Sequence, residues 1–385
     1  MNISRNIVGG MSGFKRSWFV ASSLPVEFTI KYSANILSKQ NGDLLEVGDS
    51  NRRLVVVDEV VWGFVEKELR DYFEHHKIEA KFCVLECTEE TKNRSTSDKI
   101  LVAMEEFGLL RRSEPVIAIG GGVLLDIVGY AASLYRRGVP YIRVPTTLLS
   151  LVDASVGVKT GINHFDRRNR LGSYYAPVAV YLDRQFVRHQ PPRDISNGLG
   201  EILKMAIIKD PELFDLLHEN ADILLEEKFQ FGAVPVRVIN RAISGMVEEL
   251  APNLWEKKLD RCVDFGHSFS PMVEMNYVDT LMHGEAVTLD CLFSSCIAYN
   301  RGMLKETDLY KVFDVAARLG LKVEHPGFQN PELLWSALSD TTKHRNGDQN
   351  LPLPDGIGNH IFCNDFKQEE LQKNIDTMMR LARGL

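Results

Sequence analysis

Two histidines in the second half of the chain stand directly beside glycines. His267 occurs in "DFGHSFSPMVE" (264–274) and His283 in "LMHGEAVTLD" (281–290). Either histidine alone would most simply be a hydrogen-bonded core residue. Together with a carboxylate, Glu201 of "NGLGEILKMA" (197–206), they could bind zinc through three protein ligands and leave a coordination position open for substrate hydroxyls. Lys204 follows Glu201 by three residues, so both side chains can face one cleft from a helix.

A run of three glycines follows an apolar stretch in "EPVIAIGGG" (114–122). Glycines at a strand-to-helix turn let the backbone approach a pyrophosphate, whose charge the helix N-terminus stabilises. Gly120, Gly121 and Gly122, with Asp126 after them, do not form the common G-x-G-x-x-G fingerprint, and a tight turn without a ligand is the alternative. Asp58 ends another strand and could hold a ribose hydroxyl or cap the next helix.

The stretch "VPTTLLSLVDASVGVKTGINHFDRRNRLG" (144–172) indicates a binding site more specifically than the glycine run does. Cationic and amide side chains alternate there with apolar residues, which favours a half-buried cleft over a solvated loop. Such donors suit a phosphorylated sugar. The residues concerned are Asp153, Lys159, Asn163, His164, Arg168 and Asn169.

The composition excludes several classes of partner. The 385 residues are 44% hydrophobic and 25% charged, as in ordinary globular proteins, and the net charge is -7. An acidic chain argues against nucleic acid or an anionic membrane as the partner. No apolar run has the length of a membrane helix and no clean signal peptide is visible, so we expect a cytoplasmic protein.

The elements that must position these residues change in kind along the chain. Residues 52–61, 80–87, 114–122 and 139–147 read as strands, and 63–76, 96–110 and 123–138 as the helices between them. This alternation predicts a parallel sheet covered by helices. Residues 198–220, 234–250, 283–302 and 309–320 read as long amphipathic helices, so we expect an α/β domain at 1–190 and a helical domain at 191–385.

The motifs "GGGVLLDIVGYAASLYRRG", "VPTTLLSLVDASVGVKTGINH", "NGLGEILKMAII" and "FGHSFSPMVE…HGEAV" together resemble the dehydroquinate synthase-like sugar phosphate cyclases. The resemblance runs in order from about Asp58 to Gly358. It implies an N-terminal Rossmann-like NAD-binding α/β domain, an all-α C-terminal metal-binding domain and a homodimer. It also implies NAD and zinc, or cobalt in its place, with Glu201, His267 and His283 as the metal ligands.

The resemblance further assigns roles to single residues. Implied NAD contacts are Asp58, Glu89, Lys92, Gly120, Gly121, Gly122, Asp126, Thr146, Thr147, Lys159, Arg168, Phe186 and His189. Implied catalytic residues are Lys159, Lys204, Asp153 and Asp264. Implied substrate contacts are Arg137, Asn169, Lys204, Asp264, Lys343 and His344, with Arg137 reaching the phosphate in the partner subunit.

Departures from dehydroquinate synthase bear on the substrate. Where that enzyme has a lysine, an arginine and an asparagine for the substrate carboxylate, this chain has Met246, Asp260 and Asp264, and Pro271 replaces a further histidine. A carboxylate facing Asp264 would be repelled, whereas a hydroxyl can donate to it. The substrate is therefore expected to carry a hydroxymethyl group instead, as sedoheptulose 7-phosphate does, and Asp264, Pro271 and "KHRNG" resemble the 2-epi-5-epi-valiolone synthases.

The implied reaction uses NAD catalytically: a hydroxyl is oxidised, phosphate is eliminated, the ketone is reduced again, and an intramolecular aldol addition closes the ring. Alternatives within the superfamily are 2-epi-valiolone, desmethyl-4-deoxygadusol and 3-dehydroquinate synthases. An NAD-dependent, metal-containing polyol dehydrogenase and a catalytically silent binding protein are alternatives of other classes.

Overall fold

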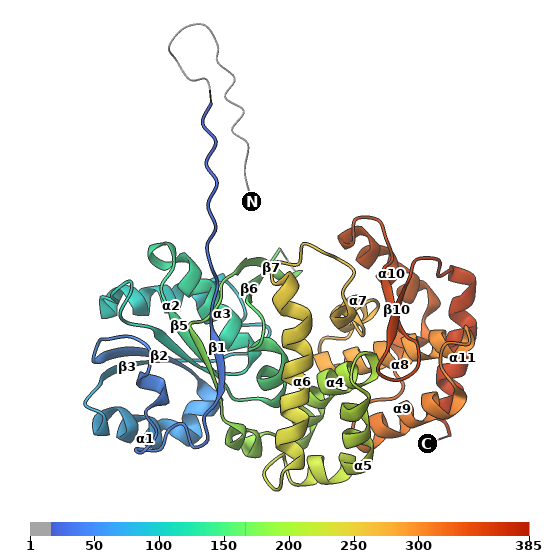
Figure 1. The fold of residues 1–385 in the computed structure, drawn as a ribbon, viewed down its shortest axis with the longest axis horizontal. Coiled ribbons are helices and arrows are strands. Elements are labelled where there is room, and N and C mark those ends of the chain that lie inside the picture. Colours follow the sequence, from blue (N-terminus) through green and yellow to red (C-terminus); the bar gives the residue numbers. More distant parts are fainter. Residues whose placement is uncertain (1–16, 166, 385) are drawn as a thin grey trace, which may run out of the picture.

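The first half of the computed structural model is built on a six-stranded sheet, and the structure describes residues 17–165 and 167–384 (Figure 1). The strands are all parallel and their order is β1-β8-β5-β4-β2-β3. Four were predicted: β2 (Arg52–Asp58), β3 (Glu79–Leu85), β4 (Val116–Gly120) and β5 (Tyr141–Pro145). β1 (Thr29–Tyr32) and β8 (Ala179–Leu182) were not, because four residues give too short a pattern.

The central strands β2, β4 and β5 are buried on both faces, which explains why they read as largely apolar runs, whereas β3 lies at the edge of the sheet and is mostly half-buried. Alternate residues of β2 enter different cores: Leu54 and Val56 pack with helices α2 (Arg94–Phe107) and α3 (Gly122–Leu134). Val55 and Val57 pack on the opposite face with α1 (Glu59–His75). The predicted parallel sheet covered by helices is confirmed.

The stretch after β5 forms a small unit of its own beside α3. A π-helical turn (Ser150–Ala154) leads into an antiparallel hairpin of β6 (Lys159–His164) and β7 (Arg167–Tyr174). The pairing shifts register between Ile162 and His164. The sequence pattern had indicated a half-buried cleft here but not a hairpin.

The second half is helical, and Figure 1 shows it on the side of the molecule away from β3, with its helix α6 toward the first half. Its core helix, α8 (His283–Asn300), is buried on nearly all sides. The other helices are α4 (Pro192–Ile208), α5 (Pro211–Glu226), α6 (Val234–Leu250), α7 (Ser270–Asn276), α9 (Glu306–Arg318), α10 (Pro331–His344) and α11 (Leu371–Ala382). Short helical turns occur in both halves of the chain, at Asp43–Leu45, Tyr135–Arg137, Arg184–His189, Ala251–Asn253, Cys262–Asp264, Pro326–Gln329 and Gln368–Glu370.

Two details of this half differ from the sequence prediction. The helical pattern over 198–220 is broken at Pro211, because Asp210 accepts from the Leu213 amide and caps a new helix. The half is also not all-helical, since β9 (Leu351–Pro354) and β10 (His360–Cys363) form an antiparallel hairpin. No described helix is both long and apolar enough to cross a membrane.

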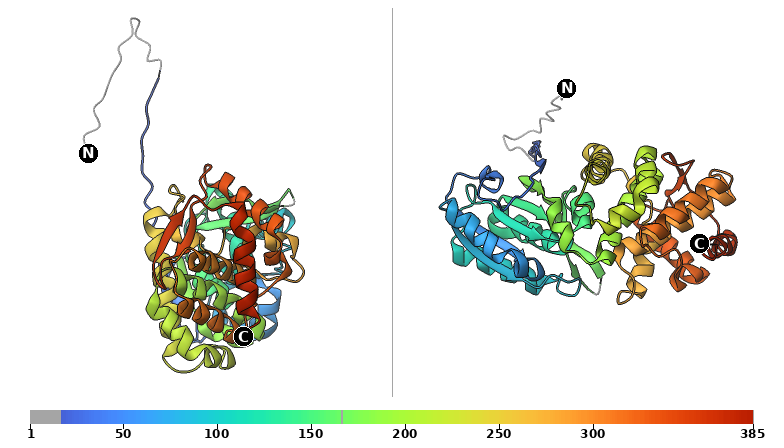
Figure 2. Two further views of the ribbon diagram at one scale, coloured as in Figure 1. Left: turned by 90° about the vertical axis from the view of Figure 1, so that its right-hand side faces the viewer. Right: turned by 90° about the horizontal axis from the view of Figure 1, so that it is seen from below.

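The last strand of the large sheet ends at Leu182 and α4 begins at Pro192. The right-hand view in Figure 2 shows the sheet and the helical half side by side along the long axis of the molecule. The division at residues 190 and 191 stays a prediction. Residues 1–16 of the first predicted domain and Leu385 of the second lie outside the described residues.

Candidate active site

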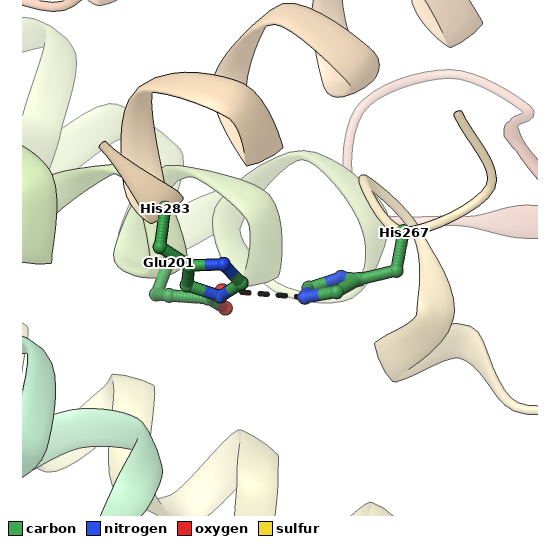
Figure 3. Close-up of side chains that lie close together, drawn as sticks. All are labelled: Glu201, His267 and His283. Carbon is green, nitrogen blue, oxygen red and sulfur yellow. Dashed lines mark ion pairs between the residues drawn. The ribbon is translucent and has the colours of Figure 1, made fainter. Parts of the chain in front are cut away.

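Glu201, His267 and His283 come together from three separate segments (Figure 3). Glu201 lies in α4, His283 is the first residue of α8, and His267 lies in the loop before α7. Glu201 Oε1 is 3.2 Å from His283 Nε2 and 3.6 Å from His267 Nε2. One ligand atom from each residue lies within 4.8 Å of the others, as a single metal ion requires.

The glycines beside these residues allow the close approach of their elements. A Cβ on Gly284 would lie 1.8 Å from the Asn197 carbonyl oxygen, and one on Gly200 would lie 2.4 Å from the Gly284 carbonyl oxygen. α4 and α8 can therefore pack closely enough to place Glu201 opposite His283. Gly266 has a φ of 77°, which favours glycine at the turn into His267.

Outer contacts orient both imidazoles. His283 Nδ1 lies 3.2 Å from Glu274 Oε2, and Glu274 also pairs with Arg168. His267 Nδ1 lies 3.2 Å from the Phe265 carbonyl oxygen. A metal-binding histidine commonly donates its second ring nitrogen to such an acceptor, which fixes the tautomer and leaves the other nitrogen free for the ion.

The carboxylate of Glu201 fits a metal ligand. It is 3% exposed, and neither oxygen has a hydrogen-bond partner within residues 17–165 and 167–384, although Lys204 Nζ lies 2.5 Å from Oε2. Burial alone would raise the pKa of Glu201, but Lys204 and the two imidazoles lower it well below its usual range. A buried, ionised carboxylate without good hydrogen bonds is costly unless a cation compensates it.

The neighbouring groups are strongly coupled to this carboxylate. Burial opposes the charge on Lys204, but Glu201 and Asp153 outweigh it and raise the Lys204 pKa to about 12. Burial lowers the pKa of His267 to about 4. For His283, Glu201 and Glu274 overcome the effect of burial and raise the pKa to about 10. Burial, and then the charge of Glu201, raise the pKa of Asp153.

A cleft of about 880 Å³ connects this cluster with the β6–β7 hairpin. Seven of the predicted catalytic or binding residues of the two halves line it, together with both histidines of the cluster and Met246 and Pro271. Those seven are Asp126, Asp153, Lys159, Asn169, Lys204, Asp264 and His344.

The polar residues of the first half are tied together at one side of this cleft. Lys92 Nζ donates to Asp126 Oδ2 and to Asn169 Oδ1, both at 2.6 Å. Asn163 donates to Glu89 Oε1 at 2.8 Å, and Arg168 Nε lies 3.5 Å from the same oxygen. Predicted cofactor and substrate contacts therefore share one hydrogen-bonded network.

The residues predicted to hold NAD gather at the carboxyl ends of adjacent strands. Asp58, Gly120 and Thr146 end or follow β2, β4 and β5, and parallel sheets bind ligands at this edge. The N-cap of α3 is Gly121, which has no side chain that could cap the helix. A Cβ at this position would lie 3.3 Å from Thr147 Cγ2. The Thr146 hydroxyl is buried without a partner in the described chain. These features fit a pyrophosphate at the α3 N-terminus.

Both interpretations of Asp58 remain compatible with its position. Its Oδ1 accepts from the Val60 amide at 2.9 Å and the Val61 amide at 3.3 Å, so it caps α1. Its second oxygen makes no hydrogen bond to those amides. A contact with a ribose hydroxyl stays a prediction.

Among the predicted residues that do not line this cleft, four have other surroundings. Arg137 is exposed at the end of the turn after α3, and Lys343 is exposed on α10. Phe186 and His189 line a separate hollow of about 520 Å³, where His189 stacks on Phe64 with ring centroids 4.1 Å apart. Their predicted roles are not tested by these positions.

Several residues that the structure brings to the site were not predicted from the sequence. Glu274 contacts His283, and Arg261, Glu256 and Arg345 line the cleft. Arg261 stands three residues before Asp264, a spacing that could have signalled their pairing. No local signal marks Glu274 as the partner of a histidine nine residues later.

Two family models match consecutive parts of the chain: 3-dehydroquinate synthase N-terminal over residues 82–197 and 3-dehydroquinate synthase C-terminal over residues 198–343. The chain belongs to the 3-dehydroquinate synthase family. The resemblance seen in the motifs and the expected fold, a Rossmann-like sheet domain with a helical second half, are confirmed.

Individual members of the 3-dehydroquinate synthase family are similar over nearly the whole chain. The 2-epi-5-epi-valiolone synthase of Actinoplanes sp. is 45% identical, covering 95% of this chain and 94% of that protein. The demethyl-4-deoxygadusol synthase of Trichormus variabilis is 34% identical over 92% of this chain and 88% of its own length. The solved structure of ValA, the 2-epi-5-epi-valiolone synthase of Streptomyces hygroscopicus subsp. jinggangensis 5008 with NAD+ and Zn2+ bound, matches with a TM-score of 0.90 at 44% identity, covering 94% of this chain and 99% of that one.

Proposed function

We propose that this protein is a lyase of the sugar phosphate cyclase type, which converts sedoheptulose 7-phosphate into 2-epi-5-epi-valiolone and phosphate. The observation that carries the proposal is that His267 and His283, which cluster with Glu201, line one cleft with Lys159, Asp264 and Met246. The similarity to 2-epi-5-epi-valiolone synthases at about 45% identity supports it. The lower identity to the demethyl-4-deoxygadusol synthase makes that product the weaker alternative.

Zinc held by Glu201, His267 and His283 would supply a Lewis acid for a substrate hydroxyl, and NAD would supply a reversible hydride acceptor. ValA, which binds NAD+ and Zn2+, supports both assignments. Residues 1–190 would hold NAD, and residues 191–385 would hold the metal and most of the sugar. The overall change releases phosphate and rearranges the sugar without net oxidation, so NAD is regenerated in each turnover.

The residues of the cleft would bind and orient the sugar. Lys204 stays protonated at neutral pH, since its pKa is about 12, and can donate hydrogen bonds to hydroxyls. Burial, and then the charge of Glu201, raise the pKa of Asp153, so its carboxyl group accepts a proton more readily than that of an exposed aspartate. Lys159 is more than half exposed at the cleft and would donate to the phosphate in addition to its pairing with Glu256.

Arg137 would complete the phosphate site of a second copy. It is exposed and does not line the cleft of its own chain, which is consistent with a homodimer in which it reaches the partner's site. The homodimer and a cytoplasmic location stay predictions.

Incubation of the purified protein with sedoheptulose 7-phosphate, NAD and zinc tests the proposal. We expect one phosphate per product molecule, no net gain of absorbance at the NADH band, and 2-epi-5-epi-valiolone in the NMR spectrum. Stoichiometric NADH would indicate a polyol dehydrogenase instead. A different cyclitol in the spectrum would assign another cyclase activity.

A further inference from the structure

The wall of the cleft next to His267 carries an arginine–aspartate pair. Arg261 Nη2 donates to Asp264 Oδ1 at 2.6 Å, and Arg261 Nε donates to Asp264 Oδ2 at 3.2 Å. Asp264 therefore binds the Nε–Nη2 edge of the guanidinium through both of its oxygens. This bidentate geometry is the one by which arginine binds any carboxylate, including that of a ligand.

The pair lies where a substrate would touch it. Both residues line the cleft, and their side chains retain 18% and 15% exposure. The remaining end of the guanidinium, Nη1, pairs with Glu256, which also pairs with Lys159. Arg345 Nη2 lies 3.8 Å from Asp264 Oδ2 on the other side.

The cations of the cleft are thus already neutralised by the protein itself. Each lysine and arginine among the described lining residues lies within 4 Å of a carboxylate, including Lys204 beside Glu201. A second carboxylate, brought by a ligand, would be desolvated without gaining a free cation. A neutral hydroxyl loses far less on entering the same position.

We infer that Asp264 determines substrate specificity by occupying the edge of Arg261 that would otherwise bind a substrate carboxylate. The inference rests on the proposed function and deepens it. Asp264 then acts as an internal carboxylate that masks a cation, and its contact with a substrate hydroxyl is not required for the discrimination. The cleft keeps a latent binding site for an anionic sugar head.

The inference predicts a gain of binding, which a merely structural role of Asp264 would not give. Asp264→Ala should expose the Nε–Nη2 edge of Arg261 to a ligand. A charge-assisted pair is worth enough to strengthen binding by about 10- to 100-fold. The gain should appear for a ligand with a carboxylate at the sugar head and be absent for one with a hydroxymethyl group.

Calorimetric titration of the NAD- and zinc-loaded enzyme can measure this difference. The two probes are non-eliminating phosphonate analogues of sedoheptulose 7-phosphate and of the heptulosonate 7-phosphate used by dehydroquinate synthases. Wild type should prefer the first probe, and Asp264→Ala should shift the ratio of dissociation constants by at least about tenfold toward the second. The control is the double variant Asp264→Ala, Arg261→Gln. It should not bind the carboxylate probe more tightly, because the guanidinium that would pair with the carboxylate is removed.

An unchanged ratio in Asp264→Ala, or a gain that survives in the double variant, would overturn the inference. If Asp264→Ala does not fold, Asp264→Asn keeps the side-chain volume, removes the charge, and should shift the ratio in the same direction. Turnover of sedoheptulose 7-phosphate by the wild type is measured beside these titrations. Absent turnover would contradict the proposed function, whereas normal turnover with an unchanged ratio would contradict only the masking of Arg261.

Discussion

Glu274 Oε2 lies 3.2 Å from His283 Nδ1, on the side of the imidazole that faces away from Glu201. Glu274 is 5% exposed and belongs to α7, the short helix that follows His267 in the chain. One carboxylate thereby links the segment that carries the first histidine to the ring of the second. Its pairing with Arg168 extends the link to the β6–β7 hairpin of the first half.

Glu274→Gln should weaken zinc binding by about 10- to 100-fold, because outer partners of metal-binding histidines contribute that much to affinity. The amide can keep a hydrogen bond to Nδ1 but cannot stabilise positive charge on the ring. Competition with a chromogenic chelator measures the affinity. Glu90→Gln, which changes an exposed glutamate, is the matched control and should bind zinc as the wild type does.

His267→Ala should remove both stoichiometric zinc and turnover, because two remaining ligands hold zinc poorly. Metal content after gel filtration, together with phosphate release, measures the two effects. His75→Ala changes an exposed histidine at the end of α1 and should leave both unchanged. A full equivalent of zinc in purified His267→Ala would show that this histidine is not a ligand.

Thr146→Val should separate NAD binding from stability. The Thr146 hydroxyl is buried without a partner in the described chain, so replacing it with a methyl group should leave the unfolding free energy equal or up to about 1 kcal/mol higher. Affinity for NAD should fall about tenfold, since valine lacks the hydroxyl that would contact the cofactor. Fluorescence titration and chemical denaturation give the two values.

Thr160→Val is the control for Thr146→Val. Its hydroxyl lies 2.8 Å from the Ser173 hydroxyl, so its removal should destabilise the fold by about 1 kcal/mol. Equal NAD affinity in wild type and Thr146→Val would argue against a cofactor contact at this threonine.

Asp290 should make stability depend on pH. It accepts from the Phe269 and Ser270 amides at 2.6 and 2.8 Å, and burial raises its pKa from 3.8 to about 6. Because the folded-state pKa is the higher one, the contribution is fully present below about pH 4 and is lost as the pH rises through about 6. Asp290→Asn keeps an acceptor for the amides but does not titrate.

Relative to wild type, Asp290→Asn should therefore gain roughly 1 kcal/mol of unfolding free energy between pH 5 and pH 7. Urea denaturation of both proteins at each pH gives this difference and cancels the effects of other groups. A difference that stays constant over this range would show that Asp290 does not titrate there.

The sequence by itself determined most of the elements and the chemistry of the metal cluster. The strands β2, β4 and β5 are largely apolar and β-branched because both of their faces are buried, and α6 has the bounds that its periodicity predicts. Glycines beside His267 and His283 were visible as an unusual pattern. Their reason, close contact between α4 and α8 and a left-handed turn at Gly266, became clear only in the structure.

Tertiary structure alone decided which charges meet. Arg261 stands close to Asp264 in the chain, but Glu256, Lys159 and Arg345 reach the same wall from a loop, a hairpin and the end of a helix. Whether Asp264 is free to accept a hydroxyl or already holds a guanidinium depends on distances of a few ångströms between these segments. Electrostatic interactions change steeply over such distances in a half-buried cleft, and residue types and spacing do not contain that information.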